Sequence, residues 1–181
     1  LQALATAGVT DIHLLPVFDL ATVKENPADR VDLTSPFADL CARSPVPIAA
    51  SRCNVFAGKT VGEALATFGP AATQQQEFTG YMSELDGFNW GYDPFHYTAP
   101  EGSYASDAAD GATRVLEFRQ MVMGLHQAGL RVGMDVVYNH TTRHGQDEKS
   151  VLDRIVPGYY HRLDATGAVT QSTCCSKTAT Q

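Results

Sequence analysis

Residues 125–138 read LHQAGLRVGMDVVY. The pattern is typical of the last turn of a helix, a glycine that ends it (Gly129) and a short apolar strand. Glycine suits that place because the left-handed backbone that ends a helix brings it no Cβ clash. Residues 4–17, LATAGVTDIHLLPV, repeat the pattern around Gly8. Both strands are near-continuous apolar runs, as in a parallel sheet covered by helices, so the sequence predicts an α/β fold.

One full amphipathic helix is predicted from Thr113 to Ala128. Four apolar side chains recur on one face at helical spacing, namely Val115, Phe118, Val122 and Leu125. Polar residues lie largely away from that face, and Asp107 or Asp110 can cap the first turn. This helix leads directly into the second strand, which completes a helix–glycine–strand unit.

Two long excursions, residues 19–110 and 139–181, follow the two predicted strands. Loops in compact α/β units usually take about 2–6 residues, so excursions of this size indicate functional elaboration. Within the first, Val61, Leu65 and Phe68 predict a short helix, and residues 71–76 are expected to form a solvated linker. Both excursions leave the carboxyl ends of strands, where (β/α)8 TIM barrels build their active sites. The layout predicts two consecutive strands of a partial TIM barrel.

Composition excludes two classes of partner. The formal net charge is −7 and no Lys/Arg cluster occurs, which argues against nucleic acid. No run approaches the roughly 20 apolar residues of a membrane span. The acidic composition is compatible with a neutral polymer. Because the chain begins with Leu1, a targeting segment cannot be read, and the localisation stays open.

The four cysteines do not show the repeated spacing of a structural zinc site. Cys41 and Cys53 bracket a short loop and could form a disulfide in an oxidising compartment, or stay free thiols in a reducing one. The adjacent Cys174 and Cys175 could form a strained disulfide.

Asp135 places a carboxylate inside an apolar strand. Such a group is costly unless it is paired or hydrogen-bonded, so it is either a structural aspartate or an active-site carboxylate. Asn139 and His140 follow where the strand ends, which favours a functional site.

Residues 88–97, FNWGYDPFHY, form an aromatic segment with interspersed polar groups. This composition suits a sugar, whose ring has apolar C–H faces and a rim of hydroxyls. Taken alone, the segment could equally be an aromatic minicore in a loop.

Several segments carry a resemblance to glycoside hydrolase family 13, the α-amylase family. Residues 135–140 (DVVYNH) resemble its first signature region, at the end of the third barrel strand, and residues 8–16 resemble its second strand. Residues 88–94 closely resemble the Tyr-Asn-Trp-Gly-Tyr-Asp/Asn-Pro motif of type I pullulanases and limit dextrinases, departing only in Phe88. Residues 100–106 and 150–160 also resemble that subgroup. Residues 1–181 are therefore expected to be the N-terminal part of an incomplete glycosidase barrel.

The resemblance implies a substrate-holding half-site. Tyr92 matches a tyrosine that stacks on the glucose ring where cleavage occurs, and His140 matches a histidine that hydrogen-bonds the 6-hydroxymethyl group of that sugar. Asp135 matches an aspartate that orients neighbouring groups, whereas Trp90 would shape the subsite wall and Asp93 the loop. No cofactor is required for the chemistry, but Asn139 matches a position that binds calcium in many amylases.

The resemblance also implies that the catalytic carboxylates lie elsewhere. Retaining glycosidases use two carboxyl groups about 5–5.5 Å apart, and in this family they lie on later strands, beyond residue 181. We expect no catalytic residue in this chain and no activity from it alone. The full-length protein is expected to hydrolyse α-1,6-glucosidic linkages in pullulan, starch or limit dextrin. The alternatives are an isoamylase-like or branching enzyme and a non-catalytic glucan-binding module.

Overall fold

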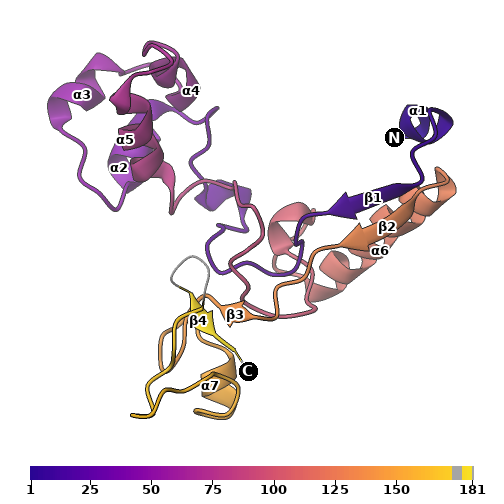
Figure 1. Ribbon diagram of the computed structural model, residues 1–181. Helices are drawn as coiled ribbons and strands as arrows, with labels where there is room; N and C mark the ends of the chain where they lie inside the picture. Colours follow the sequence, from indigo (N-terminus) through magenta and orange to yellow (C-terminus); the bar gives the residue numbers. More distant parts are fainter. Residues whose placement is uncertain (173–176, 181) are drawn as a thin grey trace. The chain divides into compact units, whose positions relative to one another are not determined.

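The computed structural model describes residues 1–172 and 177–180, and the chain separates into two compact units (Figure 1). The first unit comprises Leu1–Ala21 and Asn89–Gln181, and the second comprises Thr22–Phe88. The predicted excursion of residues 19–110 is therefore not one loop. Most of it is a compact unit of its own, and its last part packs with the strands.

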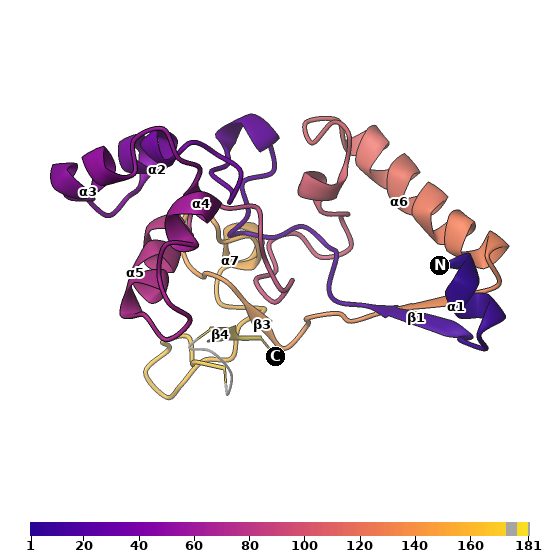
Figure 2. The same ribbon diagram turned by 90° about the horizontal axis from the view of Figure 1, so that it is seen from above.

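The first unit is built on a parallel strand pair. It begins with α1 (Gln2–Thr6) and β1 (Asp11–Leu14), and after the second unit continues with α6 (Gly111–Gln127) and β2 (Arg131–Met134). β1 and β2 pair in parallel, with Ile12 opposite Val132, and α6 returns the chain to the start of β2 (Figure 2). The mixed α/β fold predicted from the helix–glycine–strand repeat is confirmed.

Helix α6 begins at Gly111 and ends at Gln127, close to the predicted Thr113 and Ala128. The Asp110 carboxylate accepts the amide hydrogens of Ala112 and Thr113, which have no partner within the helix. At the other end, Gly129 has a φ of +84° and turns the chain into β2.

The two strands are less buried than their apolar sequence suggests. Exposed and half-buried residues alternate along both strands, and Leu15 and Val136, just beyond them, are exposed. Among the described residues this sheet has two strands, so most of its apolar surface has no neighbour to pack against. The expected burial on both faces is thus not seen.

Residues 139–180 contain short elements. They are β3 (His140–Thr141), α7 (Leu152–Ile155) and β4 (Thr178–Ala179), and η2 (Gly102–Tyr104) precedes α6 in the same unit. β3 and β4 pair antiparallel, with Thr141 opposite Thr178. This pairing ties the start of the second excursion to its end.

The second unit has its own hydrophobic core. Its elements are η1 (Pro27–Asp29), α2 (Phe37–Arg43), α3 (Ala50–Val55), α4 (Val61–Leu65) and α5 (Thr73–Met82). Phe37, Phe56 and Phe78 pack together with ring centroids 5.0–5.8 Å apart. Because aromatic rings bury large apolar areas, this cluster contributes strongly to the core of the unit.

Two local predictions for this unit have different outcomes. The short helix predicted from Val61 and Leu65 is confirmed as α4, which opens with a capping box between Thr60 and Glu63. The solvated linker predicted at 71–76 is wrong, because α5 begins at Thr73. Its three glutamines lie at the start of the helix and are exposed or half-buried, and Phe78, Tyr81 and Met82 are buried further along it.

A disulfide joins Cys41 of α2 to Cys53 of α3. Cys174 and Cys175 lie outside the described residues. Within residues 1–172 and 177–180, no helix is both long and apolar enough to cross a bilayer.

Candidate functional site

Asp135 lies just beyond β2 and gathers polar side chains from three segments. Its backbone N–H donates to the carbonyl of Leu14 (2.9 Å), which extends the parallel ladder past the strand end. Its Oδ2 accepts the Tyr92 hydroxyl at 2.7 Å, and its Oδ1 lies 3.2 Å from Nε2 of His13. The Asp135 side chain remains 44% exposed. An accessible carboxylate therefore lies at the carboxyl end of the sheet, with its neighbours already oriented.

The contact with Asp135 changes the acidity of the Tyr92 hydroxyl. The hydrogen bond to Asp135 raises the pKa of the Tyr92 hydroxyl, because the neutral phenol donates to the carboxylate. Tyr92 thus acts as a donor here, and the residue stays 40% exposed.

Gly91 explains how the Tyr92 loop reaches the sheet. The Asn89 side chain accepts the Gly91 amide hydrogen (2.7 Å), which forms a tight turn, and Gly91 has a φ of +91°. A Cβ atom on Gly91 would lie 2.2 Å from the carbonyl oxygen of Pro16, just after β1. Only glycine permits so close an approach, so this residue fixes the loop against the end of β1.

The following residues fasten the loop on its other side. Asp93 forms an ion pair with Lys177 (2.5 Å), and its backbone carbonyl accepts the Ala21 amide. The Thr142 hydroxyl donates to the carbonyl of Pro94 (3.1 Å). Residues 89–94 thus form a loop that is held between the ends of the two strands. Phe88 is the last residue of the other unit.

His140 lies next to this loop and is buried, with 4% of its surface exposed. Its Nε2 donates to the backbone carbonyl of Tyr92 (3.0 Å), and the Tyr97 hydroxyl donates to the His140 carbonyl (2.8 Å). Within the described residues, its Nδ1 is buried without a hydrogen-bond partner. The imidazole is therefore held in one orientation, with its second ring nitrogen buried and unpaired among the described residues.

Tyr97 holds the backbone of His140 through its hydroxyl group. Burial raises the pKa of its hydroxyl to about 12, and the nearby Tyr138 adds to the effect. The Tyr97 and Tyr138 rings meet edge to face, 5.5 Å apart. Tyr97 therefore stays a neutral donor to the His140 backbone at any physiological pH.

The structure brings together most of the residues singled out in the sequence. Tyr92 contacts both Asp135 and His140, Asp93 fastens the same loop, and the Trp90 side chain is 63% exposed beside it. Exposed aromatic rings next to a carboxylate and an imidazole can hold a ring that has apolar faces and hydroxyl edges. His13 and Tyr97 were not predicted as site residues from the sequence. The parallel register places His13 opposite Gly133, two residues before Asp135, and this pairing could have indicated that His13 lies near the site.

Asn139 does not by itself form a calcium site among the described residues. It is exposed, and its backbone carbonyl accepts the Thr180 amide (3.3 Å). Calcium takes about six to eight oxygen ligands, so most would have to come from elsewhere. Calcium at Asn139 stays a prediction.

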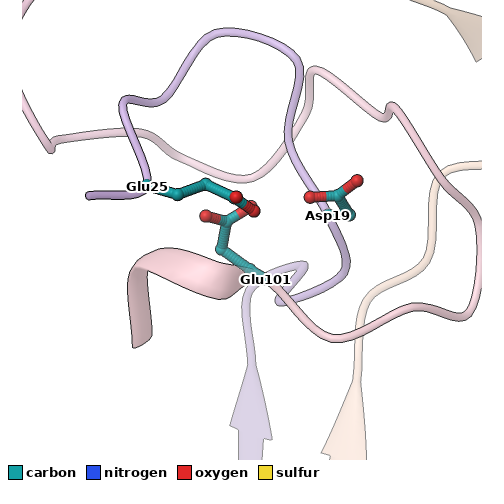
Figure 3. Close-up of side chains that lie close together, drawn as sticks. All are labelled: Asp19, Glu25 and Glu101. Carbon is teal, nitrogen blue, oxygen red and sulfur yellow. The ribbon is translucent and has the colours of Figure 1, made fainter. Parts of the chain in front are cut away.

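Two buried carboxylates, Asp19 and Glu101, support the loops behind the site (Figure 3). Glu101 accepts the amides of Leu20 (2.7 Å) and Ser103 (2.8 Å), and so caps η2. Asp19 lies 2.5 Å from Nδ1 of His96 and 3.5 Å from Arg114. The third residue labelled in Figure 3, Glu25, belongs to the other unit. The acidic residue in the segment at 100–106 therefore caps η2 and binds the backbone of the neighbouring loop at Leu20.

Comparison with known proteins identifies relatives along the whole chain. Residues 20–88 match the model of the Pullulanase Ins domain. The chain is 46% identical to a pullulanase of Klebsiella pneumoniae over 99% of its length, and 37% identical to the chloroplastic Pullulanase 1 of Arabidopsis thaliana over 100%. It spans only 17% and 16% of these two proteins.

A solved structure agrees with these matches. The crystal structure of Klebsiella pneumoniae pullulanase complexed with maltotriose matches 98% of this chain and 18% of its own, with a TM-score of 0.86 and 44% identity. Almost the whole chain is therefore similar to one part of pullulanases, and residues 20–88 match the Pullulanase Ins domain.

Proposed function

We propose that this chain is part of a pullulanase-type member of glycoside hydrolase family 13. The full-length protein would hydrolyse α-1,6-glucosidic linkages in pullulan, starch or limit dextrin, with retention at the sugar carbon. The observation that carries this proposal is the loop at 89–94, which Gly91 seats on the end of β1 so that Tyr92 meets Asp135. The similarity to a pullulanase that was crystallised with maltotriose supports an α-glucan as the ligand.

The fold supports a partial (β/α)8 barrel. β1, α6 and β2 form a parallel strand–helix–strand unit, and the site lies at the carboxyl ends of its strands. Apolar residues on this unit, such as Leu116, Met123 and Val136, are exposed. The remaining strands and helices of a closed barrel would bury them, because apolar surface is driven out of water.

Each site residue has a role that its surroundings allow. The exposed ring of Tyr92 would stack on the glucose at the cleavage subsite, and Trp90 would form part of the wall. His140 would hydrogen-bond the 6-hydroxymethyl group once sugar binding exposes its ring, since in this structure its Nε2 donates to the Tyr92 carbonyl and its Nδ1 is buried. Asp93 would keep the loop in place through Lys177.

We assign no catalytic role to Asp135. Its two oxygens are occupied by Tyr92 and His13, so the residue orients neighbouring groups and does not attack the sugar. The nucleophile and the acid/base would be carboxylates of the full-length protein outside residues 1–181. The chemistry would need no cofactor.

The proposal is tested on the full-length protein with two polymers. We expect it to release reducing ends from pullulan, whose α-1,6 linkages a debranching enzyme cleaves. Amylose, which has only α-1,4 linkages, should be cleaved far more slowly. Release of reducing ends from amylose with pullulan left intact would overturn the debranching assignment.

A further inference from the structure

Asp153, His161 and Thr141 form a buried chain of contacts next to β3. Nδ1 of His161 lies 3.1 Å from Oδ1 of Asp153, and Nε2 of His161 lies 2.9 Å from the Thr141 hydroxyl. Asp153 also accepts the amides of Gly145 (2.7 Å) and Gly158 (3.0 Å). An aspartate, a histidine and a hydroxyl thus follow one another, the first two at ion-pair distance and the last two at hydrogen-bond distance.

The charge on Asp153 is well supported. Burial alone would raise the pKa of its carboxyl, but the two amide donors and His161 outweigh burial, and the pKa is lowered. The carboxylate therefore stays ionised, and Nδ1 of His161 carries the proton that faces it. Nε2 is left to interact with Thr141.

This arrangement is not a nucleophilic triad. His161 is fully buried, and Thr141 and Asp153 are nearly so, so no substrate can reach the hydroxyl. The Thr141 hydroxyl is also occupied, because it lies 2.9 Å from the Arg143 carbonyl and 2.5 Å from the Thr178 hydroxyl. The chain of contacts holds groups in place.

What it holds is the strand that carries His140. Thr141 pairs with Thr178 in the β3–β4 ladder, and the adjacent His140 donates from its ring to the Tyr92 carbonyl. A two-residue strand has little backbone pairing of its own, so side-chain contacts at Thr141 fix where the His140 ring lies. Interior groups that are packed and hydrogen-bonded in this way transmit displacements to their neighbours.

We propose that Asp153 and His161 are positioning residues that act through Thr141 to hold His140 for the sugar. This inference rests on the proposed function, because His140 matters only if it contacts substrate. It assigns the segment at 150–161 a role in substrate binding although none of its residues lies at the exposed part of the site.

The test uses Thr141→Val and Thr141→Ser in the full-length protein. Valine keeps the shape and removes the hydroxyl, whereas serine keeps the hydroxyl. Valine removes the contacts of the hydroxyl with His161, Arg143 and Thr178, so we expect Thr141→Val to lower kcat/KM by about 3- to 10-fold, mostly through KM. Thr141→Ser should stay within about twofold of the unaltered protein. His161→Gln, whose side-chain oxygen can keep an acceptor towards Thr141, provides an independent variant if it folds.

Repeating the measurement in a protein that already carries His140→Ala separates an effect through His140 from a general loss of stability. If Thr141 acts through His140, Thr141→Val should change kcat/KM by less than about twofold when His140→Ala is already present. A full 3- to 10-fold loss in both backgrounds, or no loss in either, would overturn the inference.

The substrate controls keep the two proposals apart. kcat and KM are measured on both pullulan and amylose, at a temperature where circular dichroism shows all variants folded. A protein that cleaves only amylose refutes the α-1,6 assignment, but the variants still test the positioning of His140. A protein that cleaves neither polymer refutes both.

Discussion

Gly91 shows how one residue determines the geometry of the site. Its backbone has a φ of +91°, and a Cβ atom there would overlap the Pro16 carbonyl. Gly8 has a similar φ of +99°, but among the described residues nothing lies within 4 Å of its Cβ position. Replacing either glycine by alanine would therefore carry a similar backbone cost. Only at Gly91 would the new Cβ atom also clash with a neighbouring atom.

We expect Gly91→Ala to impair the full-length protein far more than Gly8→Ala. Both variants carry the roughly 1–2 kcal/mol cost of a left-handed alanine. Only Gly91→Ala must also move the loop that carries Tyr92, so its kcat/KM on pullulan should fall by more than about tenfold. Thermal unfolding and kinetics of both variants provide the comparison. Equal activities would show that the approach to Pro16 does not matter for the site.

Tyr97 is the second residue whose role depends on one contact. Tyr97→Phe leaves the His140 carbonyl without its hydroxyl donor and should cost about 0.5–1.5 kcal/mol of stability. KM should rise as well, because His140 is released on one side. Tyr159→Phe is the matched control, since that side chain is 67% exposed. Indistinguishable melting temperatures and KM values for the two variants would refute this role.

At the scale of single residues, the sequence singles out candidate site residues but not the contacts that join them. Tyr92, Asp135 and His140 stand out by residue type and motif, and the structure brings them together. His13 and Tyr97 do not stand out, because their contacts join residues that lie far apart in the sequence. His161 is also missed, since a lone histidine in a polar segment shows nothing of its burial.

The elements were predictable where their signals are local. α6 follows from its apolar spacing and from Asp110, and the parallel pair follows from the repeated helix–glycine–strand pattern. α5 was missed because a run of glutamines looks like a linker when the apolar residues that follow are not counted with it. Burial of the strands was overestimated because it depends on neighbours that local sequence does not specify.

The capping box of α4 gives a test at this scale. Thr60→Ala removes the acceptor for the Glu63 amide (3.1 Å) and should cost about 1 kcal/mol, equivalent to roughly fivefold faster local opening. Hydrogen exchange of a peptide covering residues 60–66 measures this opening in the intact protein. Thr60→Ser keeps the acceptor and should exchange at the original rate. If Thr60→Ala exchanges no faster than Thr60→Ser, the box does not stabilise this helix.

Considered as a whole, the chain consists of two units that differ in self-sufficiency. The unit of Thr22–Phe88 buries a phenylalanine cluster and contains a disulfide, whereas the unit built on β1 and β2 leaves apolar strand and helix surface exposed. A domain of this small size is marginal without a covalent constraint. The sequence predicted a long excursion here but not its compactness, because a core is formed by contacts between separate helices.

We therefore expect residues 22–88 to fold alone. The excised segment should show one cooperative thermal transition and dispersed NMR signals. Replacing both Cys41 and Cys53 by alanine should lower its free energy of unfolding by about 3 kcal/mol, because the disulfide closes a short loop in the unfolded chain. A segment that is unfolded with its disulfide intact would contradict this expectation.

The central claim is that the loop at 89–94 presents Tyr92 to a glucose ring at the cleavage subsite. It is tested most directly by kcat/KM on pullulan for Tyr92→Ala, Tyr92→Phe and Gln120→Ala in the full-length protein. Gln120 is an exposed control on α6. Loss of the ring removes stacking worth about 1.4–2.8 kcal/mol, so Tyr92→Ala should lose about 10- to 100-fold, and Tyr92→Phe, which keeps the ring, much less. If Tyr92→Ala retains the same kcat/KM as Gln120→Ala, Tyr92 does not hold the sugar and the proposed site is wrong.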